Sequence, residues 1–245
     1  MMVAKRDFLV LGAATLGFLT VGRIAFAQAT ADVIPEQDAD FSGSFAAIDL
    51  RNYNPTVDRT KGVEPATIEE ETLAKQIVLG EPSGTSYMEL AEYYRGLPQR
   101  NQSDEPYNAG WRKRWNPVIR QFFVATGTRP SGDVTSWCAA FVNSMLLHSG
   151  KQRTGSAAAQ SFRSFGSATT NPISGDIVVF VDKTSPGHGH VGFFLARDPV
   201  KGVLVLGGNQ SLSGNHHVVS HQWVREDGPR LRLHSFRDQK SFVVV

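Results

Sequence analysis

The sequence has little cysteine, little net charge and no long hydrophobic run, and each shortage excludes a class of protein. Its 245 residues include one cysteine, which rules out an intrachain disulfide framework and any metal site built from several thiolates. The formal net charge of +2 argues against a nucleic-acid partner. What remains, with 41% hydrophobic residues and 20% charged residues, is the composition of an ordinary globular domain.

The longest apolar run lies near the N-terminus, from Phe8 to Gly22. A helix of this length rises about 22 Å, which is less than the roughly 30 Å hydrocarbon core of a membrane. Lys5-Arg6 precedes the run, and Ala25-Phe26-Ala27 has the small-x-small pattern that signal peptidase recognises. We therefore predict an export signal over residues 1–27, with an uncleaved membrane anchor as the alternative. It resembles a twin-arginine signal with lysine in the first position, and its removal would leave a periplasmic or secreted protein without a stable anchor.

Residues 28–80 differ in composition from the rest of the chain. They carry four basic and ten acidic side chains, whereas residues 81–245 carry eighteen basic and twelve acidic ones. Prolines at positions 35, 55 and 65 interrupt the segment, and an apolar period appears only over residues 68–79. There we expect a short helix capped by Thr67. We predict an acidic tether over residues 28–80 and a folded domain over residues 81–245.

Within the folded domain, helical patterns come before strand patterns. Apolar residues recur at helical spacing over residues 87–94, after Asn116-Pro117, and over residues 137–148, where the helix is apolar on most sides and is expected to be central. Short apolar runs rich in β-branched residues then predict strands over residues 176–181, 191–195, 203–206, 217–223 and 231–236. This order, without βαβ alternation, predicts an α+β domain with an antiparallel sheet.

Cys138 lies at the start of the predicted central helix, directly after a loop that contains Pro130 and Gly132. The unpaired N–H groups at a helix N-terminus favour a thiolate and can later hold an oxyanion. A free thiol in an exported protein also risks oxidation, so its presence calls for a reason. The residues alone leave two interpretations open, a nucleophile and a buried core cysteine.

A thiol nucleophile needs a base, and His190 is the candidate among seven histidines. It leads directly into the strand predicted after it, a rigid position from which a side chain can be aimed at a helix terminus. His188, two residues earlier, points the same way but lies further into the loop. Asn209, at the end of the next predicted strand, is the candidate for a residue that orients the imidazole.

Three residues around these candidates have a structural and a functional interpretation. Asp133 is either a solvated loop acid or a substrate contact, and Trp137 either buries its ring beside the cysteine or stacks on substrate. We interpret Asp176 as a turn former rather than an acid catalyst, because it follows Gly175. His188 is a further candidate for contact with substrate.

A zinc-dependent hydrolase is an alternative, because several histidines lie close in sequence. The residues concerned are His188, His190, His216, His217 and His221. No second cysteine or well-spaced carboxylate joins them, and strand spacing would direct His216 and His217 to opposite faces. We therefore expect neither a metal nor another cofactor.

Several motifs in order along the chain resemble the NlpC-type cell-wall cysteine peptidases, which are related to CHAP amidohydrolase domains. They cover about residues 86–235: residues 116–119, Trp137-Cys138-Ala139-Ala140-Phe141-Val142-Asn143, Gly155-Ser156, residues 174–180, Gly189-His190-Val191-Gly192-Phe193, and Leu204-Val205-Leu206-Gly207-Gly208-Asn209-Gln210. The resemblance implies a papain-like α+β fold, with a catalytic cysteine at the N-terminus of a helix packed on an antiparallel sheet. It also implies hydrolysis of an amide bond in peptidoglycan stem peptides, with Cys138 as nucleophile, His190 as base and Asn209 as orienting residue. The alternative is a non-catalytic cell-wall-binding module that retains the fold.

Overall fold

A six-stranded antiparallel sheet with helices packed on it forms the computed structural model, which describes residues 62, 64–128, 130, 135–211 and 217–244. All of these residues belong to one compact unit, residues 39–245. The predicted α+β class and the antiparallel sheet are confirmed. The predicted export signal over residues 1–27 lies outside the described residues.

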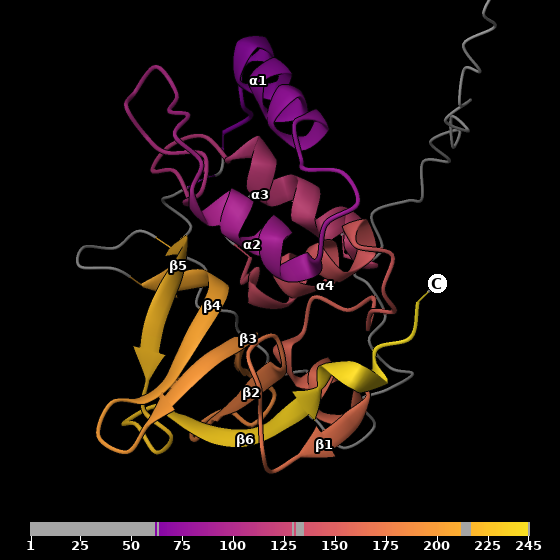
Figure 1. The fold of residues 1–245 in the computed structure, drawn as a ribbon. Helices are drawn as coiled ribbons and strands as arrows, with labels where there is room; N and C mark the ends of the chain where they lie inside the picture. The colour runs from indigo at the N-terminus through magenta and orange to yellow at the C-terminus, as the bar shows by residue number, and fades with distance from the viewer. Residues whose placement is uncertain (1–61, 63, 129, 131–134, 212–216, 245) are drawn as a thin grey trace, which may run out of the picture. The chain divides into compact units, whose positions relative to one another are not determined.

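The described part of the chain contains four α-helices (Figure 1), and the first three begin after a residue whose side chain caps the helix N-terminus. Thr67 and Ser86 form capping boxes with the glutamates three residues later, and the Asn116 side chain accepts from the Val118 N–H. The helices are α1 (Ile68–Leu79), α2 (Tyr87–Arg95), α3 (Pro117–Phe122) and α4 (Cys138–His148), with 3₁₀ turns η3 (Phe123–Ala125), η4 (Ala159–Ser164) and η5 (Gln239–Ser241).

The sheet has the strand order β1-β6-β2-β3-β4-β5, and every neighbouring pair is antiparallel. Its strands are β1 (Ser167–Thr169), β2 (Ile177–Asp182), β3 (Gly189–Asp198), β4 (Gly202–Ser211), β5 (His217–Val224) and β6 (Leu231–Asp238). The last five were predicted from their apolar runs. The strand β1 was not predicted, because its three residues are largely exposed and carry no apolar pattern.

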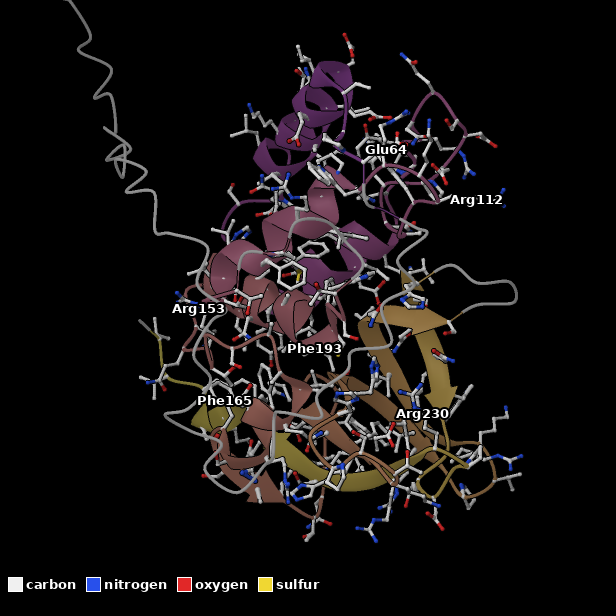
Figure 2. All side chains as sticks on the ribbon, turned by 180° about the vertical axis from the view of Figure 1, so that it is seen from behind. Glu64, Arg112, Arg153, Phe165, Phe193 and Arg230 are labelled. Carbon is white, nitrogen blue, oxygen red and sulfur yellow. The ribbon has the colours of Figure 1, made fainter. Side chains whose placement is uncertain are left out.

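Each face of the sheet carries its own apolar cluster, because side chains alternate along a strand. Val179, Val191 and Phe193 belong to the larger cluster, which also contains the buried residues of the helices. Figure 2 shows Phe193 between the helices and the sheet. Phe180 and Phe194 belong to a smaller cluster formed by alternate strand positions, on the opposite face.

The helix α4 is the centre of the helical layer, as its sequence predicts. Every residue from Cys138 to Leu146 is buried, and the helix contacts both β3 and β4. Phe141 packs against Phe122 of α3 and Phe193 of β3, which ties the helix to both layers. This packing fixes the start of α4 against the middle of the sheet.

The helix α1 belongs to the folded unit, which corrects the predicted boundary between tether and domain at residue 80. Its Ala74 and Ile77 are part of the main core cluster. Glu70 is buried and forms a bidentate ion pair with Arg114, with N–O distances of 2.8 Å. The packed unit therefore includes the second part of the predicted tether, while residues 28–61 lie outside the described residues.

A membrane-crossing helix would have to be longer and more apolar than any helix found among the described residues.

Candidate active site

Cys138 is the first residue of α4, and its side chain is almost fully buried. Burial raises the pKa of the thiol, because the charged thiolate loses its hydration. Hydrogen bonds from the backbone N–H groups of Val191, Ala139 and Cys138 itself oppose this shift. The sulfur is therefore a protonated thiol at rest, facing backbone donors that would stabilise its negative charge.

His190 is the second residue of β3, immediately before Val191, which belongs to the same core cluster as Cys138. Its ring is buried, and burial lowers its pKa to about 4, so the imidazole is neutral at physiological pH. No hydrogen bond joins this ring to the Cys138 sulfur in the structure. His190 is thus the sequence neighbour of Val191, which belongs to the same core cluster as Cys138, and both predicted residues are in their neutral form.

A β-bulge at the end of β4 decides which polar side chain reaches His190. Gly207 pairs with Ser220 and Gln210 pairs with Val218, so two residues of β4 oppose one residue of β5. Asn209 takes the left-handed conformation in this bulge, with φ of 59°, which asparagine tolerates better than most residues. The extra residue changes the alternation, so the Gln210 side chain points to the same face as that of His190.

Gln210 makes the contact that the sequence analysis assigned to Asn209. Its Nε2 lies 3.4 Å from Nε2 of His190, and its Oε1 accepts a 2.8 Å hydrogen bond from the Ser220 hydroxyl. The Oδ1 of Asn209 is buried and has no hydrogen-bond partner. The structure therefore joins His190 to Gln210 and Ser220, and it does not join His190 to Asn209.

The two glycines before the bulge leave room for groups on both faces of β4. A Cβ on Gly208 would lie 2.3 Å from the Trp137 ring, and one on Gly207 would lie 2.9 Å from Nε2 of Gln210. Trp137 is fully buried against this strand, as one of its two interpretations predicts. The Trp137 ring is inaccessible in the structure, and its predicted contact with substrate stays a prediction.

His188 lies in the loop between β2 and β3, and Gln160 holds this loop in place. Nε2 of Gln160 donates to the carbonyl of His188 at 2.9 Å and to that of Phe180 at 3.0 Å. The predicted substrate contact Asp133 lies outside the described residues. Neither Gln160 nor Gln210 was among the predicted site residues. The sequence Gly207-Gly208-Asn209 is the signal that could have indicated the bulge, because glycine and asparagine tolerate its backbone conformation.

The remaining candidates have structural roles. Asp176 is buried, and its carboxylate accepts from the backbone N–H groups of Ile173 and Gln239, which supports the turn-former interpretation. Nε2 of His221 lies 2.7 Å from a Glu92 carboxylate oxygen, so these groups pair with each other. Within the described part of the chain, no group of three or more histidine, cysteine and acidic residues is arranged to hold a metal ion, and His216 lies outside that part.

Comparisons with models of known protein families, with curated proteins and with solved structures found no match to this chain.

Proposed function

We propose that this protein is an exported, papain-like cysteine peptidase or amidase that hydrolyses an amide bond in peptidoglycan stem peptides. The observation that carries the proposal is that Cys138 is the first residue of α4, a helix that packs on β3, the strand that begins with Gly189-His190. A thiol at a helix N-terminus, an imidazole on the neighbouring strand and an amide behind the imidazole are the parts that nucleophilic catalysis requires. The substrate class rests on the resemblance of the motifs to the NlpC-type family.

The mechanism starts from the neutral pair. For Nδ1 of His190 to take the proton from Cys138, Nε2 must carry the hydrogen, so the Gln210 amide is turned in the mechanism, with Oε1 accepting from Nε2–H and the amide nitrogen donating to the Ser220 hydroxyl. The resulting thiolate attacks the amide carbonyl, and the backbone N–H groups at the start of α4 stabilise the oxyanion. His190 then gives its proton to the leaving amine. Water attacks the thioester with His190 as base, which releases the carboxylic acid and restores the thiol.

Removing the nucleophile and the base tests this function most directly. Cys138→Ala and His190→Ala should each reduce the release of fragments from purified peptidoglycan by more than about a thousandfold, measured by mass spectrometry. His188→Ala is the matched control and should retain most activity. A dead His188 variant would show that the base is misassigned, and an active Cys138→Ala variant would refute cysteine catalysis.

A second pair of variants distinguishes the roles of the two side-chain amides on β4, those of Gln210 and Asn209. Gln210→Ala should lower kcat about tenfold or more, because the imidazole loses the contact that orients it. Asn209→Ala should change kcat less, although it puts alanine at a positive φ and costs stability. Circular dichroism checks that both variants fold. A larger loss of kcat in a folded Asn209 variant would restore Asn209 to the orienting role.

The burial of Cys138 and its lack of a direct bond to His190 favour one other function, a wall-binding module without catalysis. A thiol-reactive probe separates the two. Modification of Cys138 near neutral pH that also abolishes hydrolysis supports the peptidase, whereas an inert thiol together with peptidoglycan binding supports the module. Sequencing of the exported protein tests the predicted leader, for which we expect a mature N-terminus near Gln28.

A further inference from the structure

Three arginines and a histidine gather on the sheet face that η4 covers, along β6. The Nε of Arg163, in η4, donates to Nε2 of His234 at 3.0 Å, and Nδ1 of His234 lies 2.9 Å from the Ser235 hydroxyl. Arg232 and Arg237 belong to the same strand as His234. In Figure 2 the strand runs between the labelled Arg230, which precedes it, and Phe165, whose carbonyl Arg237 binds near its other end.

Arg163 and Arg237 have no carboxylate partner among the described residues, and Arg232 shares the Asp227 carboxylate with Lys183. Arg237 is only 8% exposed, yet its guanidinium donates to the carbonyls of Phe165 and Arg163 rather than to a carboxylate. Buried charges in proteins are normally paired. Among the residues described by the structure, no carboxylate forms an ion pair with Arg163 or Arg237.

The acidic residues near this end of β6 are already engaged with other cations. Asp182 is bound by Arg230 at 2.6 Å, and Asp227, whose carboxylate also interacts with Arg232, pairs with Lys183 at 2.7 Å. His234 itself receives a hydrogen bond from a cation. Burial, followed by the charges of Arg163, Arg237 and Arg232, lowers its pKa. An anion placed among these groups would relieve their mutual repulsion.

The register of the sheet places Arg232 of this cationic cluster in line with Gly189, the residue before His190. Val181 of β2 pairs with Arg232 on one side and with Gly189, the neighbour of His190, on the other. Two strand spacings separate Arg232 from Gly189, which is roughly 10 Å. Gln160, which holds the loop before His190, and Arg163 lie three residues apart in the 3₁₀ turn η4, so they share one side of it.

We propose that Arg163, Arg232 and His234 form a subsite that binds a carboxylate of the peptide substrate. Guanidinium groups suit this ligand, because they donate paired hydrogen bonds to a carboxylate. The inference rests on the proposed hydrolase function for its substrate, and it adds a preference for short stem peptides that end in a free carboxylate.

The kinetic test compares a synthetic stem peptide that ends in a free carboxylate with the same peptide ending in a carboxamide. The wild-type full chain should show a KM about tenfold lower for the free acid. Arg232→Ala and Arg163→Ala should remove this preference by raising KM for the acid, with little change in kcat. Arg225→Ala removes an exposed arginine that directly follows β5 and is not part of the cluster, and it should keep the preference. Equal KM values for both peptides in the wild type would overturn the subsite.

A binding test separates the subsite from the proposed catalysis. In the Cys138→Ala protein with labelled histidines, the free-acid peptide should shift the NMR resonance of His234 and raise its titration midpoint, whereas the amide should not. The His234→Gln variant assigns the resonance. A shift of this resonance without hydrolysis by the wild type would uphold the subsite and refute the hydrolase. Hydrolysis without a preference for the free acid and without a shift of the His234 resonance would refute the subsite and uphold the hydrolase.

Discussion

The polar groups are exposed at one end of the β3–β4 hairpin and buried at the other end. At the turn, Asp198 pairs with Gly202, and its carboxylate accepts 2.8 Å hydrogen bonds from the N–H groups of Val200 and Lys201. These groups are close to water and bond to their sequence neighbours. At the other end, His190 and Gln210 are buried and bond to side chains from other strands.

The buried end of the hairpin is the one at which polar groups lower the stability of the fold. Burying a polar group is unfavourable unless it is fully hydrogen-bonded, and the second end buries a thiol, an imidazole and two amides. One of these groups, the Oδ1 of Asn209, is buried without a partner. An apolar strand end would be more stable. Buried polar groups that lack full hydrogen bonding are more frequent at functional sites than elsewhere, and this end of the hairpin is where the proposed function has its catalytic residues.

The largest expected difference between the two ends is their response to acid. The pKa of His190 is about 4 in the folded protein and near 6.5 when the chain is unfolded. The unfolded state therefore binds the proton first as pH falls. The stability that neutral His190 contributes is complete above pH 6.5 and is lost between pH 6.5 and 4, by up to about 3 kcal/mol.

Urea unfolding of the wild type and of His190→Gln at several pH values measures this contribution. The pKa of His234 is also lowered, so the wild type alone would mix two groups, and the difference between the proteins isolates His190. At the turn end, the pKa of Glu226 lies below its ordinary value, because Arg197 bonds to it, so its contribution is lost only in stronger acid. Parallel stability curves for the two proteins would contradict burial of a neutral His190.

A smaller effect is expected from adding one methyl group at each end. Gly208→Ala would place its Cβ 2.3 Å from the buried Trp137 ring, and we expect a loss of about 2 kcal/mol of unfolding free energy. Gly228→Ala, in the turn between β5 and β6, is the matched control, because the nearest atom would lie at 3.4 Å. Thermal unfolding measures both. Equal losses would mean that α4 does not pack closely on β4.

Much of the fold follows from local sequence patterns, because those patterns record which side of an element is buried. The helix over residues 68–79 was predicted with its bounds, and the apolar positions Tyr87, Leu90, Ala91 and Tyr94 of α2 are all buried. Two features depend on distant partners and were missed. The strand β1 forms only by pairing with β6, and α1 docks through the ion pair of Glu70 with Arg114.

The candidate site also has one part that local sequence patterns predict and one part that depends on pairing with a distant strand. Cys138 at the start of α4 and His190 at the start of β3 follow from element boundaries, which the sequence indicates through its loops and apolar runs. The identity of the amide beside His190 depends on one extra residue in the pairing of β4 with β5. A shift of one residue reverses every side chain beyond it, so spacing alone could not distinguish Asn209 from Gln210.

The smallest effect on stability is expected from removing the ion pair at the exposed end of the hairpin. Nη2 of Arg197 lies 2.7 Å from Oε2 of Glu226, and both side chains are at least one-third exposed. Solvent and salt screen such a pair, so Glu226→Gln should lower the unfolding free energy by less than about 1 kcal/mol and leave peptidoglycan hydrolysis unchanged. Urea unfolding at low and high salt measures the change, which should shrink as salt is added. A loss as large as that of Gly208→Ala, or a loss of activity, would show that the turn end contributes to the site and that the two ends are coupled.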